Sequence, residues 1–204
     1  MTVNVSFHFD FASPNSYMSN KLVPGIEKRT GVKFDYFPVL LGGIFKLTNN
    51  QAPFVTYNEV KNKPDYLRIE MARFIRDHGL SDFRMNESFP INTVKLMRGA
   101  IVAQREGFLD KYLDSVLNDM WERNLNMGDP EVMAKALSDA GLDAELIMAR
   151  INDQDVKDKL IENTSKSVEM GVFGCPTIFV GDEMFFGKDR MDAVEQEILR
   201  QQKA

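Results

Sequence analysis

Residues 3–17 read Val-Asn-Val-Ser-Phe-His-Phe-Asp-Phe-Ala-Ser-Pro-Asn-Ser-Tyr. Apolar side chains occupy every second position over 3–11, and this period of two predicts a β-strand. Ser13-Pro14 follows at once, and a serine before a proline is typical of a helix N-cap and first turn. The segment therefore predicts a strand that leads directly into a helix over 16–29, which ends at Gly31.

The remaining β-rich segments lie close to the two ends of the chain. Residues 32–41 favour a second strand, and a β-α-β opening predicts parallel strands joined by a right-handed crossover. Thr177–Val180 and Glu183–Phe186 are separated by Gly181-Asp182, which suits a tight hairpin turn. A helix is expected over 190–201. The chain thus starts with a β-α-β half and finishes with a β-β-α half.

The middle of the chain has helical patterning from about 64 to 171, after a polar loop at 49–53. The predicted helices span 64–77, 92–105 and 108–121, and three more begin at Asp129-Pro130, Asp143 and Asp155, the last ending at Met170. We therefore predict an α/β, thioredoxin-like fold with a large all-helical insertion. The thioredoxin-like part comprises 1–60 and 172–204, and the insertion comprises 61–171.

Composition narrows the range of functions. The chain has 204 residues, enough for one domain with a core, and a net charge of −5 with both signs interspersed. We expect no nucleic-acid or membrane partner, because there is no basic patch and no run of about 18 apolar residues. The single cysteine, Cys175, excludes an internal disulfide and a dithiol redox site. With no secretory signal visible, we expect a cytoplasmic protein or one from an organelle matrix.

Ser13 has two interpretations. As a helix N-cap it needs no catalytic role. Alternatively, its hydroxyl lies beside the positive end of a helix dipole, a position that stabilises an anion such as a bound thiolate. A hydrolase-type serine nucleophile is disfavoured, because G-x-S-x-G is absent and His8 and His78 are the only candidate bases. His8 offers too few neighbouring ligands for a metal site.

Two distant segments could complete a binding site. In Gly174-Cys175-Pro176-Thr177, a proline that enters a strand fits a cis bond, which exposes backbone groups to an extended peptide. Cys175 itself favours a small buried side chain, so its backbone matters more than its sulfur. In Gly187-Lys188-Asp189, a bend precedes a helix start whose N–H groups could bind a carboxylate. Taken singly, each segment also fits an ordinary structural role.

Together these motifs resemble one family over essentially the whole chain. Residues 9–17, 174–177 and 185–191 are similar to three segments of 2-hydroxychromene-2-carboxylate isomerases and kappa-class glutathione transferases. The resemblance implies a disulfide-oxidoreductase-type thioredoxin fold, glutathione as cofactor and a homodimer. It also implies an aromatic or electrophilic small-molecule substrate.

The resemblance assigns roles to particular residues. Ser13 is expected to donate a hydrogen bond to the glutathione sulfur, and the backbone of Cys175 to pair with the cysteinyl part. Lys188 and Asp189 are expected to hold the γ-glutamyl end. The other residues expected near glutathione are Asn50, Lys63, Pro176 and Gly187. The residues expected near the substrate are Lys46, Asn92 and Thr93, the last standing where an aromatic hydroxyl would be expected.

Three functions remain open. In an isomerase, the glutathione thiolate adds reversibly to a conjugated carbonyl compound, and glutathione is regenerated. In a kappa-like transferase, the same thiolate attacks an electrophile and is consumed. A non-catalytic thioredoxin-like binding protein is the third possibility, in which replacing Ser13 changes neither glutathione binding nor any activity.

Overall fold

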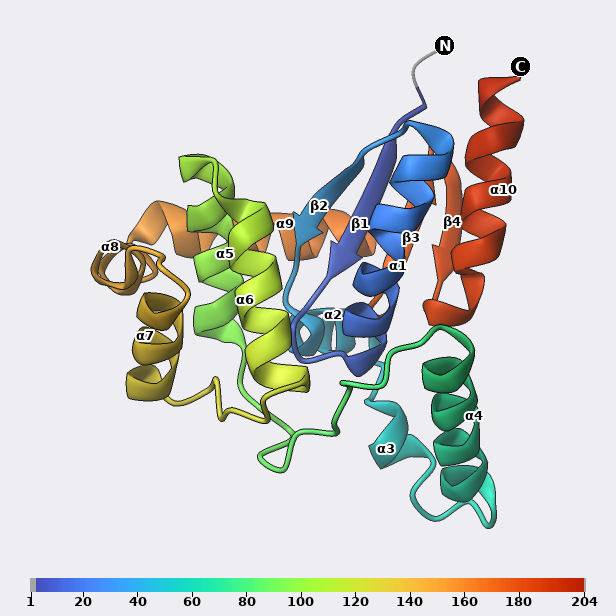
Figure 1. The fold of residues 1–204 in the computed structure, drawn as a ribbon, viewed down its shortest axis with the longest axis horizontal. Coiled ribbons are helices and arrows are strands. Elements are labelled where there is room, and N and C mark those ends of the chain that lie inside the picture. Colours follow the sequence, from blue (N-terminus) through green and yellow to red (C-terminus); the bar gives the residue numbers. More distant parts are fainter. Residues whose placement is uncertain (1–2, 204) are drawn as a thin grey trace.

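A four-stranded mixed sheet forms the centre of the molecule. The computed structural model describes residues 3–203 (Figure 1). The strands are β1 (Val5–Phe9), β2 (Phe34–Pro38), β3 (Thr177–Val180) and β4 (Glu183–Phe186), in the order β2-β1-β3-β4. β1 is parallel to β2 and antiparallel to β3, and β3 is antiparallel to β4. The predicted β-α-β opening and the hairpin are both confirmed.

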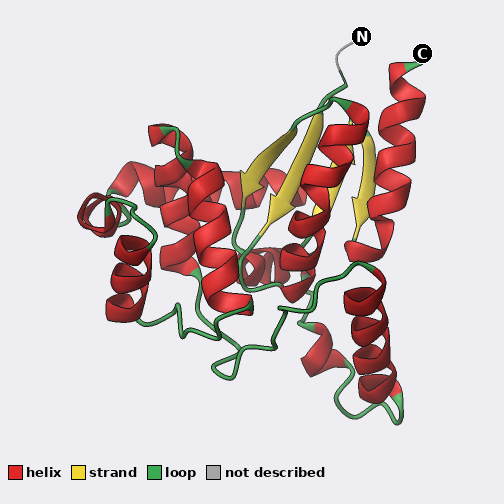
Figure 2. Ribbon diagram, in the orientation of Figure 1, coloured by secondary structure: helices red, strands yellow, loops and turns green. Residues whose placement is uncertain are grey.

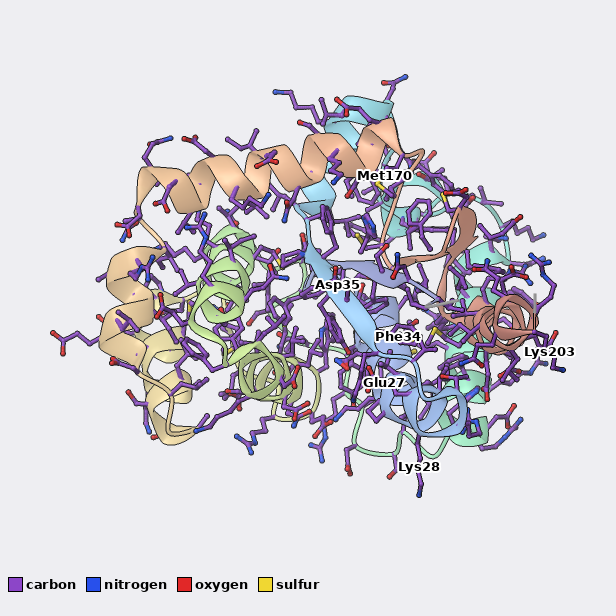
Figure 3. All side chains as sticks on the ribbon, turned by 90° about the horizontal axis from the view of Figure 1, so that it is seen from above. Glu27, Lys28, Phe34, Asp35, Met170 and Lys203 are labelled. Carbon is purple, nitrogen blue, oxygen red and sulfur yellow. The ribbon has the colours of Figure 1, made fainter. Side chains whose placement is uncertain are left out.

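Helices cover both faces of this sheet. α1 (Pro14–Thr30) and α10 (Met191–Gln202) pack on one face, and α9 (Gln154–Glu169) packs on the other, as the view along the sheet in Figure 3 shows. Because β1 lies between two layers, polar side chains on and just after this strand are also covered, although Ser6 near its start is only half-buried. His8 and Asp10 are both almost fully inaccessible to solvent. The alternation of residues in β1 therefore separates two covered faces, not a buried face and a solvated one.

The remaining helices form two groups. One group lies beside the sheet and continues its hydrophobic core: α5 (Val94–Glu106), α6 (Leu109–Trp121), α7 (Pro130–Asp139) and α8 (Ala144–Arg150). The other group lies beyond the carboxyl ends of β1 and β2 (Figures 1 and 2): α2 (Leu41–Thr48), α3 (Pro53–Thr56) and α4 (Lys63–Asp77). A short 3-10 turn, η1 (Lys188–Arg190), precedes α10. No helix in the 3–203 range is both long and apolar enough to cross a membrane.

Two expectations about these elements were wrong. The β-rich segment 32–41 forms a strand only over Phe34–Pro38, and the residues after it form α2, a helix that the sequence pattern did not predict. α9 begins after Asp153, not after Asp155. Asp155 lies in the first turn of α9, where its carboxylate accepts a hydrogen bond from Arg105 of α5 at 2.5 Å. The Asp155 carboxylate, which the sequence pattern assigned to a helix cap, therefore forms an ion pair with Arg105 of another helix.

Candidate functional site

The turn between β1 and α1 places a buried hydroxyl at a helix N-terminus. Ser13 is the N-cap of α1, and its Oγ accepts a hydrogen bond from the backbone N–H of Ser16 at 3.2 Å. Pro14 occupies the first turn of the helix, so the predicted cap is confirmed. Ser13 Oγ also donates to the carbonyl oxygen of Cys175 at 2.9 Å. The cap is therefore also a contact between segments 162 residues apart.

The segment that meets Ser13 contains the predicted cis proline. The peptide bond between Cys175 and Pro176 is cis. The carbonyl oxygen of Pro176 accepts a hydrogen bond from the backbone N–H of Gly187 at 3.0 Å. This bond ties the start of β3 to the residue just before η1. Hydrogen bonds thus join the three predicted motifs at the carboxyl end of β1.

Asn50 joins the same group from the end of α2. Its side-chain amide donates to the carbonyl oxygen of Phe173 at 2.9 Å, two residues before Cys175. Asn49, the C-cap of α2, has a left-handed backbone with φ 54°, a conformation that asparagine tolerates better than most residues. The turn out of α2 thereby directs Asn50 toward the cis-proline segment.

Lys188 and Asp189 lie in η1 and interact with each other. Lys188 Nζ donates to the carboxylate of Asp189 at 2.6 Å and also lies 4.6 Å from the centre of the Phe74 ring in α4. The Lys188 side chain is buried, whereas that of Asp189 is 66% exposed. Of this pair, Asp189 offers its carboxylate to solvent, and Lys188 links η1 to α4.

The other predicted residues are not connected to this group by hydrogen bonds. Lys63 lies at the start of α4 with its Nζ 5.1 Å from the centre of the Tyr57 ring. Asn92 directly precedes Thr93, the N-cap of α5, and its Oδ1 accepts a hydrogen bond from the N–H of Val94 at 3.1 Å. Lys46 is exposed on α2. Thr93 is buried, and its hydroxyl donates a hydrogen bond to the carboxylate of Asp10.

Asp10 is a buried residue beside the candidate site that the sequence analysis did not single out. Its carboxylate is fully buried three residues before Ser13 and accepts hydrogen bonds from Ala12, Leu41 and Thr93. The available signal was a carboxylate between two phenylalanines, directly before the Ser13 turn. The partners at Leu41 and Thr93 could not be read from the local pattern, because they lie far along the chain.

The Cys175 thiol is electrostatically unsuited to act as a nucleophile. Burial, and secondly the negative charge of Asp10, raises the pKa of the Cys175 thiol well above its usual value. The thiolate is the reactive form of cysteine, and this environment disfavours it at neutral pH. Its backbone carbonyl, by contrast, faces Ser13. This agrees with the expectation that the backbone of Cys175 matters more than its sulfur.

An aromatic cluster begins on α1 near the Ser13 turn. Tyr17 lies four residues after Ser13, so the two residues share a helix face. Neighbouring rings of the cluster have centroids 5.3 to 6.2 Å apart, in the order Tyr17, Phe83, Trp121, Phe89, Phe54. Trp121 is buried, with its Nε1 donating to the carbonyl oxygen of Phe11 at 3.0 Å, whereas half of Phe54 is exposed. The cluster therefore runs from the core beside the Ser13 turn to the surface at α3.

A separate cavity of about 720 Å³ lies at the opposite end of β1. Ser6, Asp35, Met170 and Phe179 are among its lining residues, and Figure 3 labels Asp35 and Met170. None of the predicted site residues lines it. Cavity size alone therefore does not locate the site. Over residues 3–203 there is also no group of three or more histidine, cysteine, aspartate or glutamate side chains that could hold a metal ion.

Comparison with known proteins confirms the resemblance. The chain is 24% identical to 2-hydroxychromene-2-carboxylate isomerase of Sphingobium xenophagum over 201 residues, which cover 98% of this chain and 100% of that protein. It is 26% identical to the isomerase of the same name from Pseudomonas putida, over 96% of this chain and 94% of that one. It is 27% identical to glutathione S-transferase kappa 1 of Rattus norvegicus, over 90% of this chain and 85% of that one.

The fold comparison agrees with the sequence comparison. The solved structure of a 2-hydroxychromene-2-carboxylate isomerase matches with a TM-score of 0.83 and 25% identity, over 98% of this chain and 96% of that chain. A probable DsbA oxidoreductase from Streptomyces coelicolor matches with a TM-score of 0.77 at 18% identity, which supports the fold alone. Residues 4–199 match the DSBA-like thioredoxin domain. With its mixed sheet and inserted helices, this chain belongs to the DSBA-like thioredoxin domain family.

Proposed function

We propose that this protein is a glutathione-dependent isomerase of the 2-hydroxychromene-2-carboxylate type, in which Ser13 holds the glutathione sulfur as a thiolate. The observation that carries the proposal is the 2.9 Å hydrogen bond from Ser13 Oγ to the carbonyl of Cys175. A cysteinyl group that pairs with the backbone beside Pro176 would bring its sulfur next to the Ser13 hydroxyl. Relatives named as isomerases, which match nearly the whole chain, support the same function.

The remaining polar residues suit the rest of the tripeptide. The exposed carboxylate of Asp189 would meet the ammonium group of the γ-glutamyl end, and Lys188 would orient that carboxylate. Asn50 approaches from α2, and Lys63 would close the site from the start of α4. Glutathione would then lie across the carboxyl end of β1, between the cis-proline segment and η1.

The chemistry requires a thiolate. A free thiol with a pKa of about 8.5 is only a few per cent ionised at pH 7, so lowering its pKa by two units gives nearly complete ionisation. The N-terminus of α1 would favour the negative sulfur, and the Ser13 hydroxyl would do so by turning its single proton from the carbonyl of Cys175 to the sulfur. The thiolate would form a C–S bond to the conjugated substrate and push electrons onto the carbonyl oxygen. Rotation about the resulting single bond, followed by cleavage of the C–S bond, would return glutathione unchanged.

The substrate would bind on the side of Ser13 that carries the aromatic cluster. Lys46 would pair with the substrate carboxylate, and Asn92 would hydrogen-bond to it. The Thr93 hydroxyl is already engaged by Asp10, so we assign Thr93 a contact through its methyl group and backbone. The exposed edge at Phe54 and Phe89 would stack against an aromatic ring.

A kappa-like transferase is the second candidate, because the same thiolate could attack an electrophile and leave with it. Kappa transferases among the relatives favour this alternative. The two activities are separated by following glutathione during turnover. An isomerase leaves the glutathione concentration constant, whereas a transferase consumes one glutathione per product. A binding protein would bind glutathione without turnover of either kind.

The central test is a glutathione titration followed through thiolate absorbance. Ser13→Ala removes the hydroxyl, and we expect the bound thiol to ionise at a pH about one to two units higher, the size of one charge-assisted hydrogen bond. Asp143→Ala is the matched control, because Asp143 caps α8 through the same i to i+3 contact. It loses a cap while leaving the site intact. An unchanged thiolate signal in Ser13→Ala would refute the proposed role.

We also propose that the protein is a homodimer of the cytoplasm. Apolar side chains exposed on and between α2, α3 and α4 support self-association, and a lone unpaired cysteine suits a reducing compartment.

A further inference from the structure

The carboxylate of Asp10 lies where three separate segments meet. Its Oδ1 accepts hydrogen bonds from the N–H of Ala12 at 2.9 Å and from the hydroxyl of Thr93 at 2.6 Å. Its Oδ2 accepts from the N–H of Leu41 at 2.7 Å. Ala12 belongs to the turn before Ser13, Leu41 is the first residue of α2, and Thr93 is the N-cap of α5.

The surroundings of Asp10 match an ionised carboxylate. All three partners are donors, and no acceptor for a carboxyl proton lies among its described hydrogen-bond partners. Burial raises the pKa of Asp10 above its usual value, and the hydrogen bonds from Ala12, Thr93 and Leu41 offset only part of that rise. After burial, the negative charge of Asp10 is the second cause that raises the pKa of the Cys175 thiol, and within residues 3–203 no cationic side chain pairs with Asp10.

Each of the three segments carries residues of the proposed site. The turn carries Ser13. α2 carries Lys46 and directs Asn50 toward the cis-proline segment. Thr93, the N-cap of α5, directly follows Asn92. A buried charge without a cationic partner is costly, so its three donors must hold their positions to keep it satisfied.

We propose that Asp10 is a positioning residue, whose carboxylate couples the Ser13 turn to α2 and α5 and so keeps the thiol-binding and substrate-side segments in one geometry. The role of Asp10 in catalysis rests on the proposed function, whereas the coupling between the three segments does not. Asp10 acts through the backbone and through Thr93, without touching the reacting atoms.

A shared acceptor makes the three hydrogen bonds interdependent. Thr93→Val removes one donor while preserving the shape of the side chain. Because the Thr93 hydrogen bond favours the charged form, its loss raises the pKa of Asp10. The bonds to Ala12 and Leu41 then weaken at a higher pH than in the wild type, although neither residue has been changed. Thr93→Ser keeps the donor and restores the wild-type behaviour.

Amide hydrogen exchange across a pH series tests the coupling. In Thr93→Val we expect the protection factors of the Ala12 and Leu41 amides to fall about fivefold, which corresponds to the free energy of one net hydrogen bond. We also expect the loss of protection at low pH to begin at a higher pH than in the wild type. Thr93→Ser is expected to match the wild type. Asp119→Asn is the control, because Asp119 is a buried carboxylate held by Arg123 and Ser115, away from this junction. Unchanged protection in Thr93→Val, or an equal loss in Asp119→Asn, overturns the coupling.

Glutathione titration then tests the consequence for the site. We expect Thr93→Val to weaken glutathione binding severalfold, with Thr93→Ser and Asp119→Asn close to the wild type. If the wild type binds glutathione and Thr93→Val binds it equally well, Asp10 does not position the site. If the wild type does not bind glutathione, the proposed function fails, and the exchange experiment still decides the coupling.

Discussion

His8 is a residue whose burial could not be predicted from the alternation of apolar and polar residues. It occupies a polar position in β1, yet α9 covers it, and its Nδ1 lies 2.7 Å from Ser167 Oγ. Its Nε2 lies 3.2 Å from Ser6 Oγ, and its ring packs against Phe37 and Phe179. His8 is therefore a satisfied core residue. Period-two alternation identifies a strand but not the layer that covers each face, because that layer comes from a distant part of the chain.

The buried His8 ring makes stability depend on pH. Burial, with a smaller contribution from the positive charge of Lys166, lowers the pKa of His8 from 6.5 to about 4. Protonation therefore favours the unfolded chain, so the stability contributed by neutral His8 is complete above pH 6.5 and is lost as the pH falls toward 4. We expect the free energy of unfolding to decrease by about 3 kcal/mol across that interval.

Urea unfolding at a series of pH values measures this effect. His8→Gln keeps hydrogen-bonding capacity for Ser167 and is expected to flatten the pH dependence between 6.5 and 4. His78→Gln, at the exposed C-cap of α4, serves as control and should keep the wild-type slope. A wild-type slope in His8→Gln would show that other groups cause the acid sensitivity.

At the scale of elements, α5 and α6 approach each other closely at one glycine. A Cβ on Gly99 would lie 2.0 Å from Tyr112 Oη. The Tyr112 ring is fully buried, and its hydroxyl donates to the carbonyl of Leu96 at 2.9 Å, so it cannot move aside easily. This contact fixes the position of α5, whose N-cap Thr93 reaches Asp10.

Gly99→Ala is therefore expected to destabilise the protein, although alanine favours helices. Overpacking of this kind costs about 1–3 kcal/mol. Gly42→Ala in α2 is the matched control, because a Cβ there meets no atom within 4 Å. It should gain about 0.5–1 kcal/mol from helix propensity alone. Thermal and urea unfolding of both variants give the comparison, and a neutral Gly99→Ala would contradict the close approach.

The elements differ in how far the sequence predicted them. The strands, α1 and the β3–β4 hairpin follow from local spacing and caps, and all three were predicted. α2 was missed because its first N–H is satisfied by the carboxylate of Asp10, a tertiary partner that no local pattern contains. In the candidate site, Ser13, Asn50 and Cys175 are brought together as expected. The roles of Lys46, Lys63 and Asn92 stay predictions, because no hydrogen bond or ion pair joins their side chains to that group.

At the scale of the whole molecule, the hydrophobic core runs without a break from the sheet into α5–α8. Its members include Phe7 and Ile178 of the sheet and Leu117 and Leu137 of the helices. We predicted a thioredoxin-like part, 1–60 and 172–204, and an insertion, 61–171. This division of the chain stays a prediction. The shared core suggests that the two parts are stabilised together.

The exposed apolar surface of α2–α4 is where we expect the second copy of the chain. It consists of Leu47, Phe54, Val55, Tyr57, Val60, Tyr66, Leu67 and Ile69. Stable interfaces bury about 1,200–2,000 Å² in total, so most of these exposed side chains would have to be covered in the dimer. Ile69→Glu would place a charge within the interface and is expected to shift the protein from dimer to monomer.

Sedimentation velocity measures the shift. Ile161→Glu on α9 is the control, because Ile161 is even more exposed but lies on a different helix, across the sheet from α1. It should leave the dimer intact. A monomeric wild type, or equal effects of the two variants, would argue against self-association through this surface.

The hydrogen bond between Ser13 and Cys175 also bears on how the chain is made. A growing polypeptide exposes Ser13 early, but its partner emerges only after 161 further residues have been synthesised, with all of α2–α9 in between. A tripeptide held across this contact would bind the finished fold and no shorter fragment. By mass action, a ligand at a hundredfold excess over its Kd adds about 2.7 kcal/mol to the folded state. Glutathione would then stabilise only chains that have folded completely, even in the absence of substrate.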